Sequence, residues 1–126
     1  MDDDFHLELR RESGGRLYAH VGGRATLENT LAYWRAIAGA LEAQPARHLL
    51  LVDELVGPSL TAADWSALVA EVGPRLGDLR IAHVKPRGLD TVEYCVLSAI
   101  NSGLAAQVFE DEHRASVWLR YGPDEP

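Results

Sequence analysis

Two adjacent carboxylates, Asp53 and Glu54, are the side chains of this sequence best placed to bind a ligand or to take part in chemistry. They follow the wholly apolar run at residues 49–52, which is typical of a strand that is buried on both faces. Open α/β sheets bind their ligands at the carboxyl ends of the parallel strands, so this pair is a candidate site edge. The alternative, which we favour for Asp53, is that its carboxylate accepts hydrogen bonds from backbone N–H groups of the following loop.

The histidines and the cysteine give no pattern of a metal or catalytic site. The five histidines have neither the H-E-x-x-H motif nor the i, i+4 spacing of a helical zinc site; they are His6, His20, His48, His83 and His113. His6 and His20 could face each other on the polar side of a hairpin and bind a metal there, but we favour surface positions for the histidines. Cys95 falls on the apolar side of a predicted helix, which indicates a buried structural thiol. We therefore expect no catalytic residue, no metal and no cofactor.

Composition excludes several classes of function. The 126 residues carry a formal net charge of -7, which repels nucleic-acid phosphates and anionic membrane surfaces. The only basic loop, at residues 85–88, is interpreted as a solvated turn. The acidic residues 2–4 are unlike a signal peptide, and no apolar stretch approaches the roughly 20 residues that cross a bilayer. We expect one cytoplasmic domain over residues 1–126, without membrane insertion and with a frayed tail at about 122–126.

The strands that would position these residues are indicated by apolar patterns. Apolar residues alternate over 5–10 and again over 17–21, and the glycines between them predict the turn of a hairpin. The run at 49–52 predicts a central strand. Two further strands are predicted at 79–84 and at 106–109.

Four helices are predicted between and after these strands. The first begins after Thr26 and ends before Pro45, and the second begins near Thr61 and ends at Gly73-Pro74. The third is expected at about 90–102 and the fourth at 111–121. The element order is therefore β-β-α-β-α-β-α-β-α, in which strands separated by helices pair in parallel.

The end of the chain resembles a known family. Residues 108–119 read V-F-E-D-E-H-R-A-S-V-W-L, which is similar to the "vF-x-d-x-x-x-A-x-x-W-L" ending of STAS-like (SpoIIAA-like) proteins. Residues 49–53 resemble that family's central strand, and residues 81–84 resemble its next strand. The resemblance implies a SpoIIAA-like α/β fold. Its five-stranded sheet would be mixed and mostly parallel, with the first strand antiparallel at an edge and the helices mainly on one face.

The resemblance also implies a function. Classical members are anti-anti-sigma factors, which bind a partner protein and are phosphorylated on a serine in an Asp-Ser-Ser-Gly-like segment after the third strand. Here Glu54 follows Asp53, so Ser59 is a displaced candidate for that serine, with Thr61 close by. We expect a non-catalytic binding or regulatory module that acts through protein–protein contacts, with Asp53, Glu54, Ser59 and Thr61 as its possible regulatory or ligand site.

Two other functions and one assembly state remain open. The alternative function is a carrier that holds a small apolar or lipid-like ligand between helices and sheet, and an enzyme that uses Asp53 and a histidine comes third. If the helices cover mainly one face of the sheet, the other face of residues 49–52 needs a cover. A homodimer would hide that apolar patch, so we expect a homodimer.

Overall fold

The structure is a computed structural model that describes residues 5–57, 60–76, 78–86, 100 and 105–121. The helix predicted at 90–102 lies outside the described residues except for Ile100. Cys95 and Ser59 lie outside them as well.

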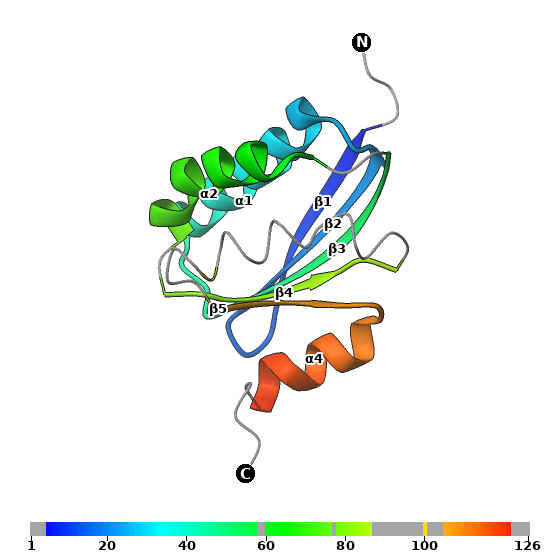
Figure 1. Cartoon of the computed structure of the whole chain (residues 1–126). Helices are drawn as coiled ribbons and strands as arrows, with labels where there is room; N and C mark the ends of the chain where they lie inside the picture. The colour runs from blue at the N-terminus through cyan, green and yellow to red at the C-terminus, as the bar shows by residue number, and fades with distance from the viewer. Residues whose placement is uncertain (1–4, 58–59, 77, 87–99, 101–104, 122–126) are drawn as a thin grey trace.

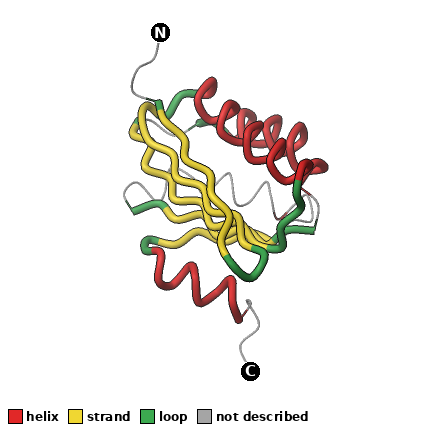
Figure 2. Tube along the Cα trace, turned by 180° about the vertical axis from the view of Figure 1, so that it is seen from behind, coloured by secondary structure: helices red, strands yellow, loops and turns green. Residues whose placement is uncertain are grey.

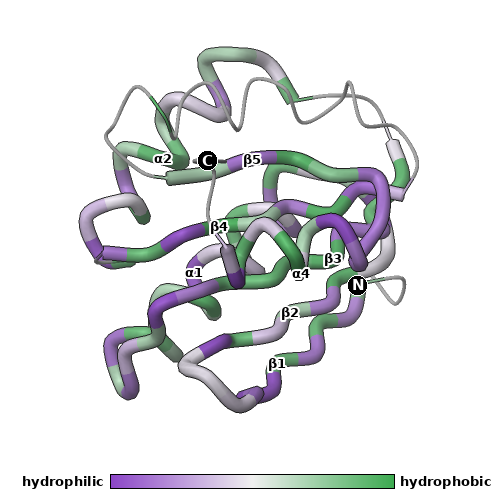
Figure 3. The backbone as a smooth tube through the Cα atoms, turned by 90° about the horizontal axis from the view of Figure 1, so that it is seen from below, coloured by the Kyte–Doolittle hydropathy of each residue, from purple (hydrophilic) through white to green (hydrophobic). Residues whose placement is uncertain are grey.

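A five-stranded sheet forms the centre of the molecule, and its strands follow one another across the sheet in chain order. The strands are β1 (His6–Glu12), β2 (Arg16–Arg24), β3 (His48–Val56), β4 (Arg80–Val84) and β5 (Ala105–Phe109). Strand β1 pairs antiparallel with β2, and the three other pairings are parallel. Figure 3 shows the sheet from below, with β1 as its outermost strand. The predicted mixed, mostly parallel sheet with an antiparallel edge strand is thus confirmed.

Glycines close the hairpin between β1 and β2. Gly14 and Gly15 have φ angles of 81° and 77°, a region of backbone conformation that side chains with a Cβ rarely adopt. The predicted turn is confirmed, and it aligns Leu9 of β1 with Ala19 of β2.

Three helices are described: α1 (Leu27–Ala43), α2 (Ala62–Leu76) and α4 (Glu112–Tyr121). Thr26 caps α1 by accepting a hydrogen bond from the backbone N–H of Asn29 at 3.0 Å, and the helix ends before Pro45 as predicted. The predicted end of α2 at Gly73-Pro74 is wrong, because the helix continues to Leu76. Leu76 is buried in the core, so packing favours this last turn although Pro74 donates no backbone hydrogen bond.

The helices lie on both faces of the sheet (Figures 1 and 2). Helices α1 and α2 share one face, and α4 covers the other. Two of the three described helices thus share a face, as predicted, and α4 is the exception. The reason is the strand β3, whose side chains are apolar on both faces: Leu49 and Leu51 join the core under α1 and α2, while Leu50 and Val52 join a second core with Ala115 and Leu119 of α4.

This arrangement removes the reason for which a homodimer was expected. Leu50 and Val52 are only 4% and 2% exposed, because α4 covers them within the same chain. No apolar patch is left at these two residues for a second copy to hide. The homodimer itself stays a prediction and needs another interface.

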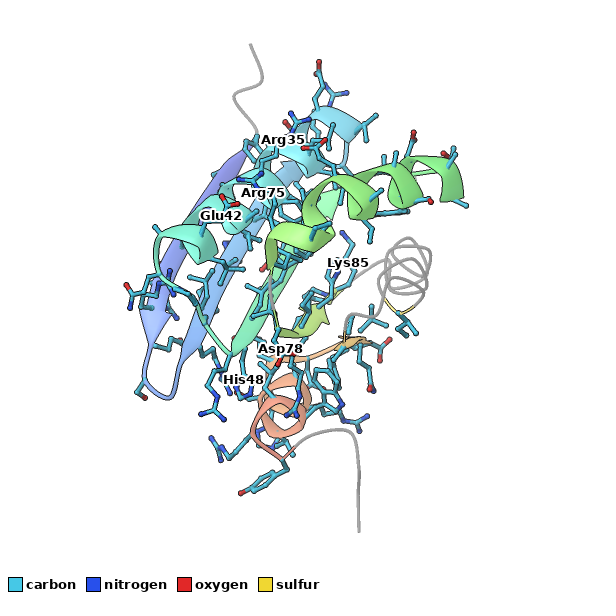
Figure 4. The ribbon with its side chains drawn as sticks, turned by 90° about the vertical axis from the view of Figure 1, so that its left-hand side faces the viewer. Arg35, Glu42, His48, Arg75, Asp78 and Lys85 are labelled. Carbon is cyan, nitrogen blue, oxygen red and sulfur yellow. The ribbon has the colours of Figure 1, made fainter. Side chains whose placement is uncertain are left out.

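Two ion pairs hold α1 and α2 side by side. The guanidinium of Arg35 makes two hydrogen bonds to Glu71, and that of Arg75 makes two to Glu42. Figure 4 shows Arg75 and Glu42 where the two helices meet. Because each pair has two parallel hydrogen bonds, it fixes the distance and the orientation of the two helices more closely than a single bond would.

Candidate functional site

Asp53 lies near the carboxyl end of β3 and is buried. Alternation along the strand places its side chain with Leu51 and Leu55, on the face covered by α1 and α2. Its carboxylate accepts a hydrogen bond from the backbone N–H of Leu55 at 3.0 Å. Asp53 thus accepts from a backbone N–H of β3 itself, whereas the sequence favoured N–H groups of the following loop.

Two cationic or polar side chains from the next strand complete a buried network around this carboxylate. His83 of β4 has its Nε2 2.8 Å from Asp53 Oδ2, and Lys85, just after β4, donates from Nζ to Asp53 Oδ1 at 3.0 Å. Lys85 also donates to the carbonyl oxygen of Leu55 at 2.6 Å. The carboxylate only accepts, so the Nε2 of His83 carries the shared hydrogen. Figure 4 shows Lys85 on the side of the sheet where α2 lies.

The network keeps Asp53 ionised in spite of its burial. Burial alone would raise the pKa of Asp53, but the hydrogen bond from His83 and the charges of His83 and Lys85 hold that pKa below its ordinary value, with the Leu55 N–H helping. The buried carboxylate is therefore satisfied by the groups around it.

The geometry of the network favours a structural role over a catalytic one. An aspartate that orients a histidine is found in hydrolases, where the histidine must reach the substrate. Here Asp53, His83 and Lys85 are 3%, 1% and 4% exposed, and Lys85 donates to both the carboxylate and a backbone carbonyl. The network thus ties the carboxyl end of β3 to that of β4, and we call it the β3–β4 clamp.

The sequence interpretation of two clamp residues was wrong. His83 was expected on the surface and Lys85 in a solvated turn, yet both are buried. A signal was present in the sequence, because β4 is apolar on both faces. Residues two apart in a strand share a face, so Ile81, His83 and Lys85 lie on the same side of it. Both side chains therefore had to point into the core beside the end of the neighbouring strand.

Glu54 lies on the opposite face of the sheet from Asp53. Its exposed carboxylate oxygen is 3.1 Å from His20 Nε2, and the His20 ring lies 5.3 Å from the ring of His6. The predicted facing of His6 and His20 is confirmed, but Asp53 and Glu54 do not form one carboxylate pair. A Cβ added at Gly22 would overlap the ring of His6, so this glycine makes room for it. Among the described residues, no group of three or more potential ligands has the arrangement to hold a metal ion.

A groove lies where β2 leads into α1 and β3 leads towards α2. Its volume is about 440 Å³, and it is lined by Arg24, Ala25, Thr26, Leu27, Val56, Gly57, Leu60, Thr61 and Asp64. Ala25 N–H donates to the carbonyl oxygen of Val56 at 2.9 Å and joins its two walls. Two apolar side chains of the lining are exposed to solvent, Leu27 by 38% and Val56 by 67%. We call this the carboxyl-edge groove.

Of the four predicted site residues, Thr61 is the one that the structure places in the lining of the carboxyl-edge groove. Its hydroxyl oxygen accepts a hydrogen bond from the backbone N–H of Asp64 at 3.0 Å, which caps α2. Ser59 lies outside the described residues. The sequence missed Leu27 and Val56, because their exposure depends on how two loops meet at the edge of the sheet.

No family model matches the chain, and no curated protein matches it. No helix in the described part of the chain is long and apolar enough to cross a membrane.

Proposed function

We propose that this chain is a non-catalytic STAS-like binding module, and that it binds a partner protein at the carboxyl-edge groove. The observation that carries the proposal is the exposure of Val56 and Leu27 in one groove at the carboxyl ends of two parallel strands. This is the edge where open α/β sheets bind their ligands. The partner segment would present an apolar side chain to this pair.

The buried state of the polar groups supports binding rather than catalysis. Three titratable side chains at this edge are buried in the core, where His83 and Lys85 are each bonded to Asp53. An enzyme of the kind considered above would need such groups to converge on an open cleft. The groove itself is lined by apolar side chains, two threonines, Arg24 and Asp64.

A small-ligand carrier is the second candidate, and the size of the groove favours it. A volume of about 440 Å³ lies within the range of pockets that hold small molecules. The site would then be the edge of the sheet rather than the space between helices and sheet, which side chains such as Leu51, Ile37 and Trp65 fill.

Replacing Val56 by Asp tests both candidates. We expect affinity capture from cell extract to recover at least about ten times less partner protein with this variant than with the wild type. A charge in an apolar contact costs more than the roughly 1.4 kcal/mol that a factor of ten requires. The matched control is Val117→Asp on α4, because Val117 is also an exposed valine, by 39%, and is not part of the groove lining. The control variant should capture the same partner protein as the wild type, in the same amount.

The outcomes separate the two candidates. Native mass spectrometry of the same samples reports whether the wild type retains a protein or a small molecule. If the wild type and Val117→Asp retain a small molecule and Val56→Asp does not, the carrier replaces the partner-protein proposal. If Val56→Asp and Val117→Asp retain the same proteins in the same amounts, binding at the carboxyl-edge groove is ruled out.

Regulation by phosphorylation at Ser59 or Thr61 stays part of this proposal. Thr61 is exposed immediately before the first turn of α2, where a helix favours an added negative charge. A phosphate there would stand in the lining of the groove and would change its charge.

A further inference from the structure

The outer edge of β1 is the feature with the clearest unexplained chemistry. β1 is the last strand on its side of the sheet described for this chain, so the backbone N–H and C=O groups of alternate residues point outward along it. Such an edge can pair with another strand. It lies beyond β2, whereas α4 packs mainly on β3, β4 and β5 and reaches β2 at Arg16 and Tyr18 (Figure 3).

The side chains of β1 differ between its two faces, although the exposed Arg11 lies on the same face as the leucines. Leu7 and Leu9 are half-buried and pack at the margin of the core under α1, whereas Glu8 and Arg10 are exposed on the other face. Arg10 lies 3.2 Å from Glu8 and 3.6 Å from Glu12, and its guanidinium stacks 3.9 Å above the ring of Tyr18. The exposed face of this edge is thus a row of charges with alternating sign.

We propose that β1 pairs antiparallel with β1 of a second copy of this chain, about a two-fold axis at Leu9. In that register each copy sets Glu8 opposite Arg10, Leu9 opposite Leu9 and His6 opposite Glu12. Opposite charges that face each other across two strands attract, and the half-buried Leu9 gains a cover from its own copy. The occupant of the edge is a second copy because the strand is complementary to itself.

Other registers of the same pairing are unfavourable. A shift by one residue would bring the charged side chains to the apolar face. A shift by two residues sets Glu8 against Glu8 in one direction, or Arg10 against Arg10 in the other. Like charges directly opposite each other repel, so the sequence of β1 selects the register about Leu9.

Charge reversal and its rescue by mixing test the interface. Sedimentation over protein concentrations from about 1 to about 500 µM should show a weak, reversible dimer for the wild type, since one strand edge is a small interface. Arg10→Glu alone and Glu8→Arg alone should each raise the dissociation constant about tenfold or more, because each places two like-charged pairs across the axis. Mixed together they are complementary again, and the mixture should form a heterodimer close to the wild-type strength.

The matched control for charge is Arg114→Glu on α4, whose side chain is 80% exposed and far from β1 in the chain. It changes the net charge as Arg10→Glu does and should leave the dissociation constant unchanged. The proposal is overturned by a wild type that remains monomeric up to about 500 µM, by Arg10→Glu behaving like Arg114→Glu, or by a mixture no stronger than its components.

A second measurement does not depend on charged variants. With Cys95 replaced by Ala, a cysteine at position 9 lies on the axis and opposite its own copy, at a separation that a disulfide can bridge. Leu9→Cys should therefore form a covalent dimer under mild oxidation. Leu7→Cys should not, because its copy lies opposite residue 11. The register is contradicted if both variants form the covalent dimer equally, or if Leu9→Cys forms no covalent dimer.

Discussion

Replacing Asp53 by Asn should lower the free energy of unfolding by about 3–5 kcal/mol, the usual cost of breaking a buried ion pair by removal of one charge. The asparagine side chain has nearly the size of the native aspartate, so the change leaves no large cavity. The loss would come from Lys85, whose buried ammonium group would no longer have the Asp53 carboxylate as its ion-pair partner. Typical domains have only about 5–15 kcal/mol of stability, so the variant should be close to unfolding at working temperature.

The matched control is Glu54→Gln, at the next residue of the same strand. Glu54 is exposed and lies on the other face, so this change should alter the free energy of unfolding by about 0.5 kcal/mol or less. Urea denaturation of both variants measures the difference. Equal stability of the two would mean that the β3–β4 clamp does not hold the ends of the strands together.

The stability that Asp53 contributes should also depend on pH. Its pKa is lower in the folded chain than in the unfolded chain, so the contribution is fully present above the unfolded value of about 4 and is lost as the pH falls through the lower, folded value. The difference in unfolding free energy between wild type and Asp53→Asn should be largest near neutral pH and shrink below about pH 4. Glu42 and Glu71 also have lowered pKa values, but they are present in both proteins and cancel. A difference that is constant with pH would contradict the ionised state of Asp53.

Cutting Leu119 back to Ala should cost about 2–5 kcal/mol of unfolding free energy, the range for leucine truncations in a core. The side chain is fully buried between α4 and the sheet, in one cluster with Ala115 and Val52. The sequence predicted Ala115, Trp118 and Leu119 as the inward side of this helix. Trp118 proves only half-buried, with its ring 5.7 Å from that of Phe109, so Leu119 is the more sensitive position.

His113→Ala, on the exposed side of the same helix, should change the unfolding free energy by less than about 0.5 kcal/mol. Thermal or urea melts of the two variants decide the matter. If Leu119→Ala is as stable in these melts as His113→Ala and the wild type, α4 does not cover the second face of the sheet as described.

Local patterns predicted most of the elements, because alternation and helical spacing are properties of short segments. The hairpin, the cap at Thr26 and the parallel pairing of the later strands follow from neighbouring residues. The side of the sheet on which α4 packs does not follow from neighbouring residues. The apolar residues on both faces of β3 required two covers, and the sequence could not distinguish a helix of the same chain from a second copy.

The site was harder to predict because it depends on strand register. Asp53 and Lys85 are 32 positions apart, and they meet only because Leu51 of β3 aligns with His83 of β4. Parity along each strand was visible in the sequence and could have shown that Asp53 and Glu54 point to opposite faces. The carboxyl-edge groove depends on how two loops meet, which no spacing of residue types expresses.

The most direct test of binding at the carboxyl-edge groove is a photo-activated cross-linking residue placed at position 56, compared with the same residue at position 117. Both positions are exposed valines, and position 56 lines the groove whereas position 117 lies on α4. We predict a discrete cross-linked product with a partner protein from position 56 and none from position 117, because a short-lived photoproduct reacts only with what lies in contact with it. Products that are the same from both positions, or absent from position 56, would contradict the proposed function.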